Sequence, residues 1–270
     1  MIGQRIMTAV CAVVFLVLLI LYGNALAFTI VAALFALLAA REWARLTALD
    51  TATQCGLYLL ALCLLMLVSF RVPTLGAALV YAGILWWCAA VLGIVYVEHW
   101  RRLLERPPIK LVTGLLILSS AWFSLISLRV DYSRDLLLFL LCLIWTADSS
   151  AYFCGKRWGR TRLAAQISPG KTWEGVYGAL LAGLVWTLLY SYWLHLPGTL
   201  PPSFLLLLAA LTIGISIVGD LTISVVKRNA GVKDSGNLFP GHGGALDRLD
   251  SLLAAAPLFL GGLWLQECWT

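Results

Sequence analysis

The chain contains 270 residues, of which 61% are hydrophobic and 12% are charged, and it carries a formal net charge of +6. Soluble domains contain roughly 25% charged residues, so this composition, with a mean hydropathy of +0.92, excludes an ordinary soluble protein and indicates a polytopic membrane protein. The seven cysteines lie mostly in apolar runs without a CxxC pair, which argues against a metal-binding or disulfide framework.

Nine apolar stretches supply, or nearly supply, the roughly 20 residues that a transmembrane helix needs. We therefore predict an all-α fold with about nine spans, at 8–23, 25–41, 53–70, 74–97, 111–128, 135–155, 175–196, 203–226 and 247–266. The first two stretches are short and close together, so a tilted pair or a re-entrant hairpin is an alternative. A signal peptide is disfavoured for the first, because a second apolar run follows almost at once.

The basic residues are distributed unevenly over the loops between these stretches. Assigning alternate loops to alternate sides puts 16 of the 19 Lys and Arg residues on one side and leaves Arg71, Arg129 and Arg134 on the other. Such an excess marks the cytoplasmic side, which predicts a cytoplasmic N-terminus and places the polar loops 156–174 and 227–247 in the cytosol.

No linker of domain size interrupts the helices. We therefore divide the chain only into N-terminal helices, 1–134, and a C-terminal region, 135–270, that carries both polar loops and the candidate catalytic residues.

Two aspartates, Asp148 and Asp220, are embedded in apolar sequence. A carboxylate near the bilayer centre costs about 2.5–3.5 kcal/mol on insertion scales, and a metal or a cationic partner would offset that cost. A buried Asp that pairs with a helix-end Lys or Arg for packing alone is the alternative. Because both residues flank the same predicted side, we favour a functional site.

Polar positions on the last two predicted helices share faces. Asp220, Ser224 and Lys227 follow at i, i+4 and i+7 and form a stripe that leads toward the cytosol. Asp247 and Asp250, at i and i+3, likewise face one way. Carboxylates with nearby hydroxyls favour a hard cation such as magnesium, which commonly bridges carboxylates to phosphates. The three histidines lack the spacing of zinc ligands.

A GHGG run, residues 241–244, precedes the last predicted helix. Glycines there would let backbone amides approach a phosphate at a helix N-terminus, although Gly-rich turns are common. The basic loops on this side would also suit anionic lipid headgroups. The composition of this side therefore indicates an anionic ligand without identifying it.

The other polar loop contains ISPGKTWEG, residues 167–175, whose GKT is similar to the end of a P-loop. The P-loop interpretation fails, because its spacing requires glycine where Ala165 stands and because we expect no strand before it. Lys171 remains as a point charge for phosphate, with Ser168 and Thr172 as hydroxyl donors. A capped Ser-Pro helix start is the structural alternative, and the two interpretations are compatible.

The segment 224–250 resembles the C-terminal signature of the phosphatidate cytidylyltransferase family, also called CDP-diacylglycerol synthase. SxxKR, four residues, KD, a small residue, PGHGG and xDRxD all occur at matching spacing. The resemblance extends through VGDLT (218–222), WTADSSAY (145–152) and SPGKTWEG (168–175), and more loosely through REWARL (41–46). It therefore covers most of the C-terminal half specifically.

Two positions depart from the family's pattern. The helix before the KR pair usually reads GDLxES, whereas here the acidic position is Ile223, which would remove a possible metal or water ligand. The position after GHGG is Ala245, where a larger aliphatic residue is usual, and this change concerns packing.

The resemblance implies transfer of the cytidylyl group of CTP to phosphatidate, with release of pyrophosphate, formation of CDP-diacylglycerol and a requirement for magnesium. The attacking phosphate oxygen is already ionised at pH 7, so catalysis reduces to aligning two polyanions and neutralising their repulsion. We expect an integral protein of a bacterial inner (plasma) membrane with its site on the cytoplasmic side. The family suggests a homodimer, and no nucleic-acid partner is expected.

Our hypothesis for the site follows from this reaction. Asp220 and Asp247 hold magnesium, Asp250 is either a further ligand or a residue that supports the ligands, and Asp148 supports the polar cavity. The remaining residues bind or orient the substrate phosphates, and they are Ser168, Lys171, Thr172, Ser224, Lys227, Arg228, Lys233, Asp234, His242, Gly243, Gly244 and Arg248.

Two other classes of function remain open at this point. Another CTP-using membrane enzyme, such as a polyprenol kinase or an ether-lipid cytidylyltransferase, would use similar parts. An anion transporter would also place Asp and basic residues among spans, but its polar residues are expected mid-span in paired broken helices, whereas these cluster at the helix ends.

Overall fold

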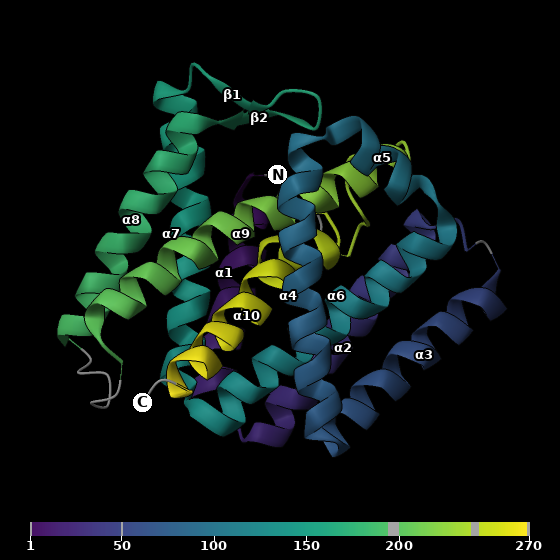
Figure 1. The fold of residues 1–270 in the computed structure, drawn as a ribbon, viewed down its shortest axis with the longest axis horizontal. Helices are drawn as coiled ribbons and strands as arrows, with labels where there is room; N and C mark the ends of the chain where they lie inside the picture. Colours follow the sequence, from purple (N-terminus) through teal and green to yellow (C-terminus); the bar gives the residue numbers. More distant parts are fainter. Residues whose placement is uncertain (1, 50, 194–199, 239–242, 269–270) are drawn as a thin grey trace.

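The computed structural model describes residues 2–49, 51–193, 200–238 and 243–268. Ten α-helices, one π-helical turn and a two-stranded hairpin follow one another in this part of the chain (Figure 1). Their bounds are α1 Ile2–Tyr22, α2 Ala25–Leu46, α3 Ala52–Arg71, α4 Pro73–Val95, α5 Val97–Glu105, α6 Pro107–Ser127, η1 Leu128–Tyr132, α7 Arg134–Trp158, β1 Arg162–Ala164, β2 Ser168–Thr172, α8 Trp173–Trp193, α9 Pro202–Asn229 and α10 Leu246–Glu267.

The helices confirm the predicted class of a polytopic all-α membrane protein. Within the described residues, eight helices are long and apolar enough to cross a bilayer, and α1 contributes a shorter apolar section, Val10–Tyr22. These nine helices lie where the sequence predicts spans. Because the apolar section of α1 is short, eight of these helices meet the length and hydropathy expected of a membrane span.

Local signals in the sequence explain where the helices begin. Pro73, Pro107 and Pro202 stand at the first helical position of α4, α6 and α9, where proline costs no hydrogen bond because that N–H has no helical partner. Thr51 and Gln54 form a reciprocal capping box at the start of α3. The starts of α3, α4, α6 and α9 are therefore encoded locally.

Several helices extend beyond their predicted ends, which corrects the predicted loops. α2 continues from position 41 to Leu46, α7 continues to Trp158, and α9 continues to Asn229. Basic residues in the last turn of a helix interact favourably with its dipole, so Lys156 and Lys227 extend these helices rather than ending them. The first charged residue after an apolar run is therefore a poor marker of a helix end.

Two short elements were not predicted. The amphipathic α5, VEHWRRLLE, buries Trp100 and Leu104 and exposes Arg102, while its half-buried Arg101 donates a hydrogen bond to Asn229 of α9. The antiparallel hairpin pairs Arg162 with Thr172 and Ala164 with Ser168. The expectation that no strand precedes the GKT sequence is therefore wrong, although the missing glycine still excludes a P-loop.

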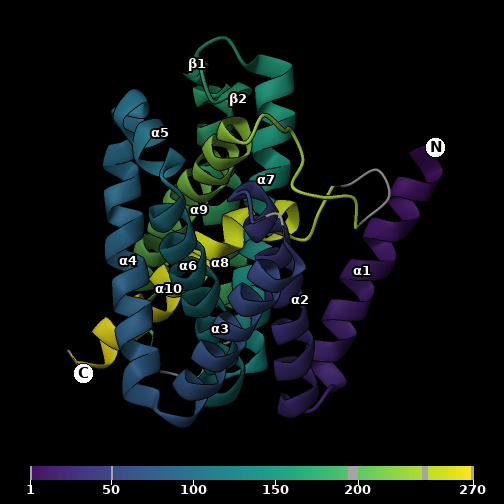
Figure 2. The ribbon, with the colours of Figure 1, turned by 90° about the vertical axis from the view of Figure 1, so that its right-hand side faces the viewer.

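The helices pack around α6, α9 and α10. α10 contacts α9 along its length and also contacts α2, α4 and α6, while α7 packs mainly on α8. The main contacts of α1 are with α2 and α7, and much of this helix stands apart from the rest of the bundle (Figure 2). The core thus joins helices from both halves of the chain.

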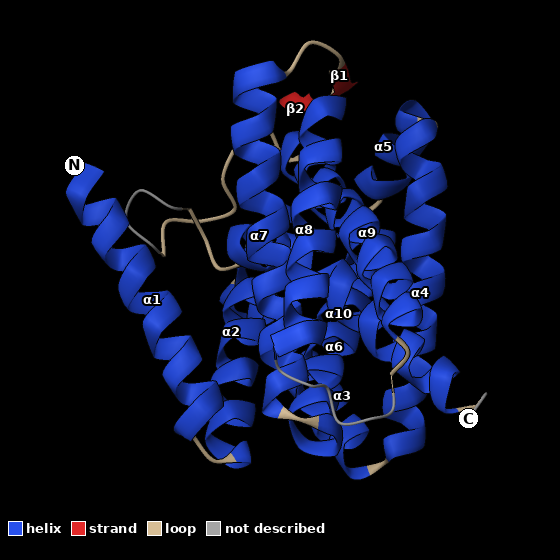
Figure 3. Cartoon of the chain, turned by 90° about the vertical axis from the view of Figure 1, so that its left-hand side faces the viewer, coloured by secondary structure: helices blue, strands red, loops and turns tan. Residues whose placement is uncertain are grey.

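The polar connections gather at one end of the molecule. Figure 3 shows the hairpin, α5 and the start of α1 toward one end, whereas α10 ends toward the other. The described part of the connection between α9 and α10 also lies toward the hairpin end. The fold therefore brings the two polar segments of the sequence to the same end of the helices.

Candidate functional site

The described part of the chain contains two ion pairs, and both join α9 to another element at the hairpin end. Lys227 Nζ lies 2.6 Å from Asp247 Oδ1, and Lys171 Nζ lies 2.5 Å from Asp220 Oδ2. The Lys227 and Asp247 side chains are 10% and 7% exposed, whereas those of Lys171 and Asp220 are 25% and 30% exposed. The first pair is therefore buried and the second is accessible from outside.

Asp247 lies at the centre of the buried pair and accepts hydrogen bonds at both oxygens. Lys227 Nζ donates to Oδ1, while Oδ2 accepts from Ser235 N at 2.9 Å and Gly244 N at 2.9 Å and lies 3.0 Å from Ser235 Oγ. A carboxylate offers about four lone-pair positions. Three protein donors therefore occupy the Asp247 carboxylate in this structure.

Gly243 and Gly244 allow the backbone to approach these carboxylates. Gly243 has φ +82°, a conformation that favours glycine, and a Cβ there would collide with the Asp247 carboxylate. A Cβ on Gly244 would collide with the carboxylate of Glu42. The two glycines make room for protein carboxylates, and the Gly244 amide that was expected to bind phosphate is bonded to Asp247.

Glu42, on α2, was not among the predicted site residues. Its Oε2 accepts from Ser235 Oγ at 2.6 Å and from Leu246 N at 2.8 Å, and its Oε1 accepts from Ala245 N at 2.9 Å. Figure 2 shows the chain running past the end of α2 between α9 and α10. We refer to the connected set Glu42, Lys227, Ser235 and Asp247 as the buried clamp.

Asp220 forms the second centre. Besides its ion pair with Lys171 from the hairpin, it accepts from Ser224 Oγ at 3.4 Å, so the predicted i, i+4 relation brings Ser224 onto the same face. Asp148 on α7 and Asp250 on α10 each interact electrostatically with Asp220 and with Lys171. We refer to Asp148, Lys171, Asp220 and Asp250 as the open acidic group.

Few donors neutralise the carboxylates of this group. Asp148 Oδ1 accepts from Ser251 Oγ at 3.4 Å, and Asp250 Oδ1 accepts from the neighbouring Ser251 N at 2.8 Å. Lys171 provides the one ion pair to the group among the described residues. Three carboxylates on three helices therefore share one ion pair, and Lys227 and Arg248 also attract Asp250 and Asp148 electrostatically. The carboxylate oxygens of this group could bind a further cation.

A preformed metal cage is absent from the part of the chain that the structure describes. No set of three or more His, Cys, Asp or Glu side chains there is close enough to hold a metal ion. Magnesium typically uses one or two protein carboxylates and takes its other ligands from water and substrate phosphates. The oxygen donors of Asp220 and Asp250 fit that pattern, and the carboxylate of Asp247, a predicted ligand, is bonded to Lys227, Ser235 and Gly244 in this structure.

The hairpin residues have different environments. Thr172 is buried, and its Oγ1 accepts from Gly175 N at 3.2 Å, which caps the start of α8. Ser168 is half-buried at the opposite end of β2, where its backbone pairs with Ala164. Of the three hairpin residues predicted to bind phosphate, Lys171 alone contacts the open acidic group in the structure.

The other predicted residues lie on the exterior around the two centres. Arg228 is exposed and donates to the Val232 carbonyl at 3.0 Å, while Lys233 and Asp234 are exposed in the segment after α9. Arg248 is exposed at the start of α10 and interacts electrostatically with Asp148. His242 lies outside the described residues.

The two positions that depart from the resembled pattern are both buried. Ile223 is 0% exposed within α9, so it belongs to the core of the helix packing. Ala245 is also 0% exposed, and its backbone amide binds Glu42. Neither side chain contributes a polar group to the two centres.

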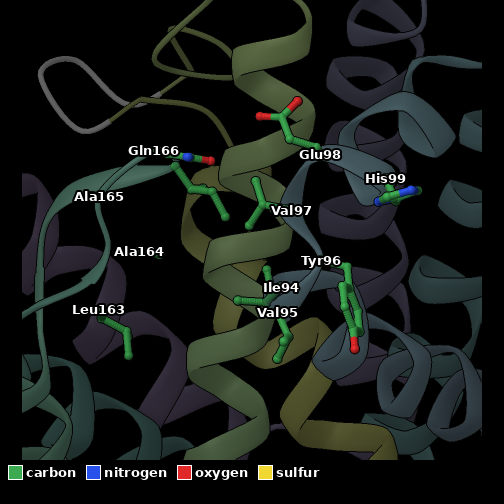
Figure 4. Close-up of a pocket in the computed structure, with 11 residues that line it drawn as sticks. Ile94, Val95, Tyr96, Val97, Glu98, His99, Leu163, Ala164, Ala165 and Gln166 are labelled. Atoms are coloured by element: carbon green, nitrogen blue, oxygen red, sulfur yellow. The ribbon is translucent and has the colours of Figure 1, made fainter.

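A cavity of about 520 Å³ lies between the α4–α5 junction and the hairpin (Figure 4). Ile94, Val95 and Val97 line one side, and Leu163 and Ile167 line the other. None of the predicted site residues that the structure describes lines it, and the open acidic group is therefore a separate feature of this end of the molecule.

Comparison with known proteins gives a consistent set of relatives. A family model described as the cytidylyltransferase family matches residues 3–265. The chain is 42% identical over 236 residues to a phosphatidate cytidylyltransferase of Pseudomonas aeruginosa, with 84% of each chain covered. It is 40% identical over 184 residues to one of Haemophilus influenzae, with 64% of each chain covered. With one of Synechocystis sp. it shares 52% identity over 122 residues, 43% of this chain and 38% of the relative.

Proposed function

The chain belongs to the cytidylyltransferase family, and from that premise we propose that it transfers the cytidylyl group of CTP to phosphatidate, forming CDP-diacylglycerol and pyrophosphate. The names of its bacterial relatives support the choice of phosphatidate. The structural observation that carries the proposal is the open acidic group, where three carboxylates and Lys171 meet at the polar end of an integral membrane protein.

The reaction needs positioning and charge neutralisation more than proton transfer. A phosphate oxygen of phosphatidate forms a bond to the α-phosphorus of CTP, the bond from that phosphorus to the bridging oxygen of the β-phosphate breaks, and pyrophosphate leaves. The attacking oxygen is ionised at pH 7, so no general base is required. The basic side chains of the site therefore have the main task of holding two polyanions in line.

Lys171 is the residue that we assign to direct phosphate contact. Its side chain is 25% exposed and projects from the hairpin to Asp220. The exposed Arg228, Lys233 and Arg248 surround the same end of α9 and α10 and would attract the nucleotide to it. Lys227 has its charge neutralised by Asp247 in the buried clamp, so we assign it a role in holding that segment.

Magnesium is the cofactor that we propose for this site. Asp220 and Asp250 would hold it, because both offer carboxylate oxygens on neighbouring helices and interact with each other electrostatically. When bound, the ion would neutralise phosphate charge and link the phosphates to the protein. Asp148 lies close enough to interact with Asp220 and would support the ion from α7.

We further propose that the hairpin end faces the cytoplasm of a bacterial cell, in the inner membrane. Sixteen of the 19 basic residues fall on the side assigned to this end, and basic residues are enriched on the cytoplasmic side of membrane proteins. This orientation would give the site access to cytosolic CTP and to phosphatidate in the inner leaflet.

The purified full chain in mixed micelles of detergent and phosphatidate tests the reaction. With CTP labelled at the α-phosphate, we expect label to enter lipid together with release of unlabelled pyrophosphate, and we expect a chelator to stop it and magnesium to restore it. Label from the γ-phosphate in lipid would instead indicate a kinase. Uptake of an anion into vesicles without pyrophosphate release would indicate a transporter.

A further inference from the structure

Glu42 is a buried carboxylate in the N-terminal half of the chain, and within the described residues its hydrogen-bond donors all come from the C-terminal half. Glu42 is 6% exposed, and its carboxylate accepts hydrogen bonds from Ser235 Oγ, Ala245 N and Leu246 N. A buried carboxylate is costly unless such donors satisfy it. The contacts of Glu42 are therefore a specific link between α2 and the segment that precedes α10.

This link replaces the local cap of α10. The first N–H groups of a helix have no partner within the helix and usually bind a nearby side chain. The residue at the start of α10 is Ala245, which makes no side-chain cap. Glu42 accepts two of these N–H groups from a position about 200 residues earlier in the sequence, the separations being 203 and 204 residues.

The helix that carries Glu42 is itself fixed at this end. Lys110 Nζ donates to the Leu46 carbonyl at 2.9 Å, and Trp43 Nε1 donates to the Lys110 carbonyl at 2.9 Å. These bonds join the last turn of α2 to the start of α6. Glu42 is therefore held by a rigid support, as an orienting side chain requires.

Ser235 transmits the position of Glu42 to the buried ion pair. Its hydroxyl lies 2.6 Å from Glu42 Oε2 and 3.0 Å from Asp247 Oδ2. A hydroxyl has one proton to donate, and the shorter distance assigns it to Glu42. The backbone N–H of Ser235 then donates to Asp247, which binds Lys227.

We propose that Glu42 is a positioning residue for the cytidylyl transfer, acting through Ser235 and the start of α10. The inference rests on the proposed function. Glu42 sets the position of the first turn of α10, and this turn carries Asp247 and leads into Asp250 of the open acidic group. A small displacement of that turn would move Asp250 relative to Asp220 on α9.

The test uses Glu42→Gln in the full chain, assayed with α-labelled CTP, phosphatidate and magnesium. An amide keeps the size of the side chain but presents an NH₂ group to N–H donors, so at least one of the three bonds is lost. We expect kcat to fall about 10- to 100-fold, as is typical when a side chain that orients a site is removed, with a smaller change in KM for CTP. Glu42→Asp keeps the charge and should recover part of kcat.

A control and a double variant separate positioning from general stability. Glu98→Gln makes the same chemical change at an exposed glutamate of α5 and should leave kcat unchanged. Rates are measured well below the unfolding midpoint of every variant and are normalised to folded protein. Because Glu42 acts through Ser235, the loss in Glu42→Gln/Ser235→Ala should be smaller than the product of the two single losses.

The outcomes distinguish this inference from the proposed function. If the unaltered chain transfers no label, the proposed function fails. If it transfers label while Glu42→Gln retains the wild-type kcat per folded protein, or while the losses of Glu42→Gln and Ser235→Ala multiply, the positioning role is overturned and the proposed function stands.

Discussion

The buried clamp and the open acidic group each contain a Lys–Asp ion pair with one partner on α9, but their surroundings differ. In the clamp, three donors occupy the oxygens of Asp247, and the pair is almost fully buried. In the open group, Asp220 interacts electrostatically with Asp148 and Asp250, and Lys171 makes the one ion pair to the group among the described residues. Lys and Asp therefore have a structural role in the clamp, where protein donors occupy the carboxylate. In the open group, which is more exposed, the same residue types are available to a ligand.

The largest effect that we predict is on the clamp. Asp247→Asn removes the partner of buried Lys227, and leaving one charge of a buried pair alone costs about 3–5 kcal/mol of folding free energy. We expect a lower thermal unfolding midpoint for the purified protein in detergent, together with loss of cytidylyl transfer. Adding Lys227→Met removes the unpaired charge and should recover part of the midpoint. An unchanged midpoint in Asp247→Asn would mean that the clamp is not structural.

The next prediction concerns the open acidic group. Asp220→Asn should lower kcat about 100-fold, because loss of a preorganised charged group commonly costs about 10² to 10³ in rate. Its unfolding midpoint should stay near that of the unaltered protein, since the Asp220 side chain is 30% exposed. Asp135→Asn, an exposed aspartate in the first turn of α7, is the matched control. A large drop in midpoint for Asp220→Asn would remove the distinction between the two centres.

The spans could be predicted from the sequence because the bilayer requires long apolar helices, whatever their partners. The ends of the helices were less predictable, since a residue such as Lys227 can continue a helix while pairing with a side chain elsewhere. α5 and the hairpin are too short to give a strong periodic signal. Their placement depends on packing against α9 and α7.

The candidate site was predictable in composition but not in its partners. The i, i+4 spacing correctly placed Ser224 beside Asp220, because that relation lies within one helix. Glu42 bonds Ser235 across 193 residues, a contact that no local pattern encodes. The available signal was a single acidic residue inside REWARL, at the end of an apolar run. For the same reason, the sequence could not show that Asp247 faces Lys227 and Ser235.

A smaller effect is expected at the hairpin, where the structure gives Thr172 a capping role. Thr172→Val keeps the shape of the side chain but removes the acceptor for Gly175 N at the start of α8. Loss of such a cap costs about 1 kcal/mol, so the unfolding midpoint should fall by a few degrees. KM for CTP should not change. A several-fold increase in KM with an unchanged midpoint would instead support the phosphate-binding role predicted from the sequence.

The smallest effect is expected at Lys233, which is exposed in the segment after α9 and belongs to neither centre. An exposed charge pair contributes about 0.2–1 kcal/mol, so Lys233→Ala should raise KM for CTP by less than about five-fold and leave kcat unchanged. The increase should shrink at high salt, because screening weakens exposed interactions more than buried ones. A loss of kcat as large as that of Asp220→Asn would contradict this prediction. It would mean that Lys233 acts together with the open acidic group when substrate is bound.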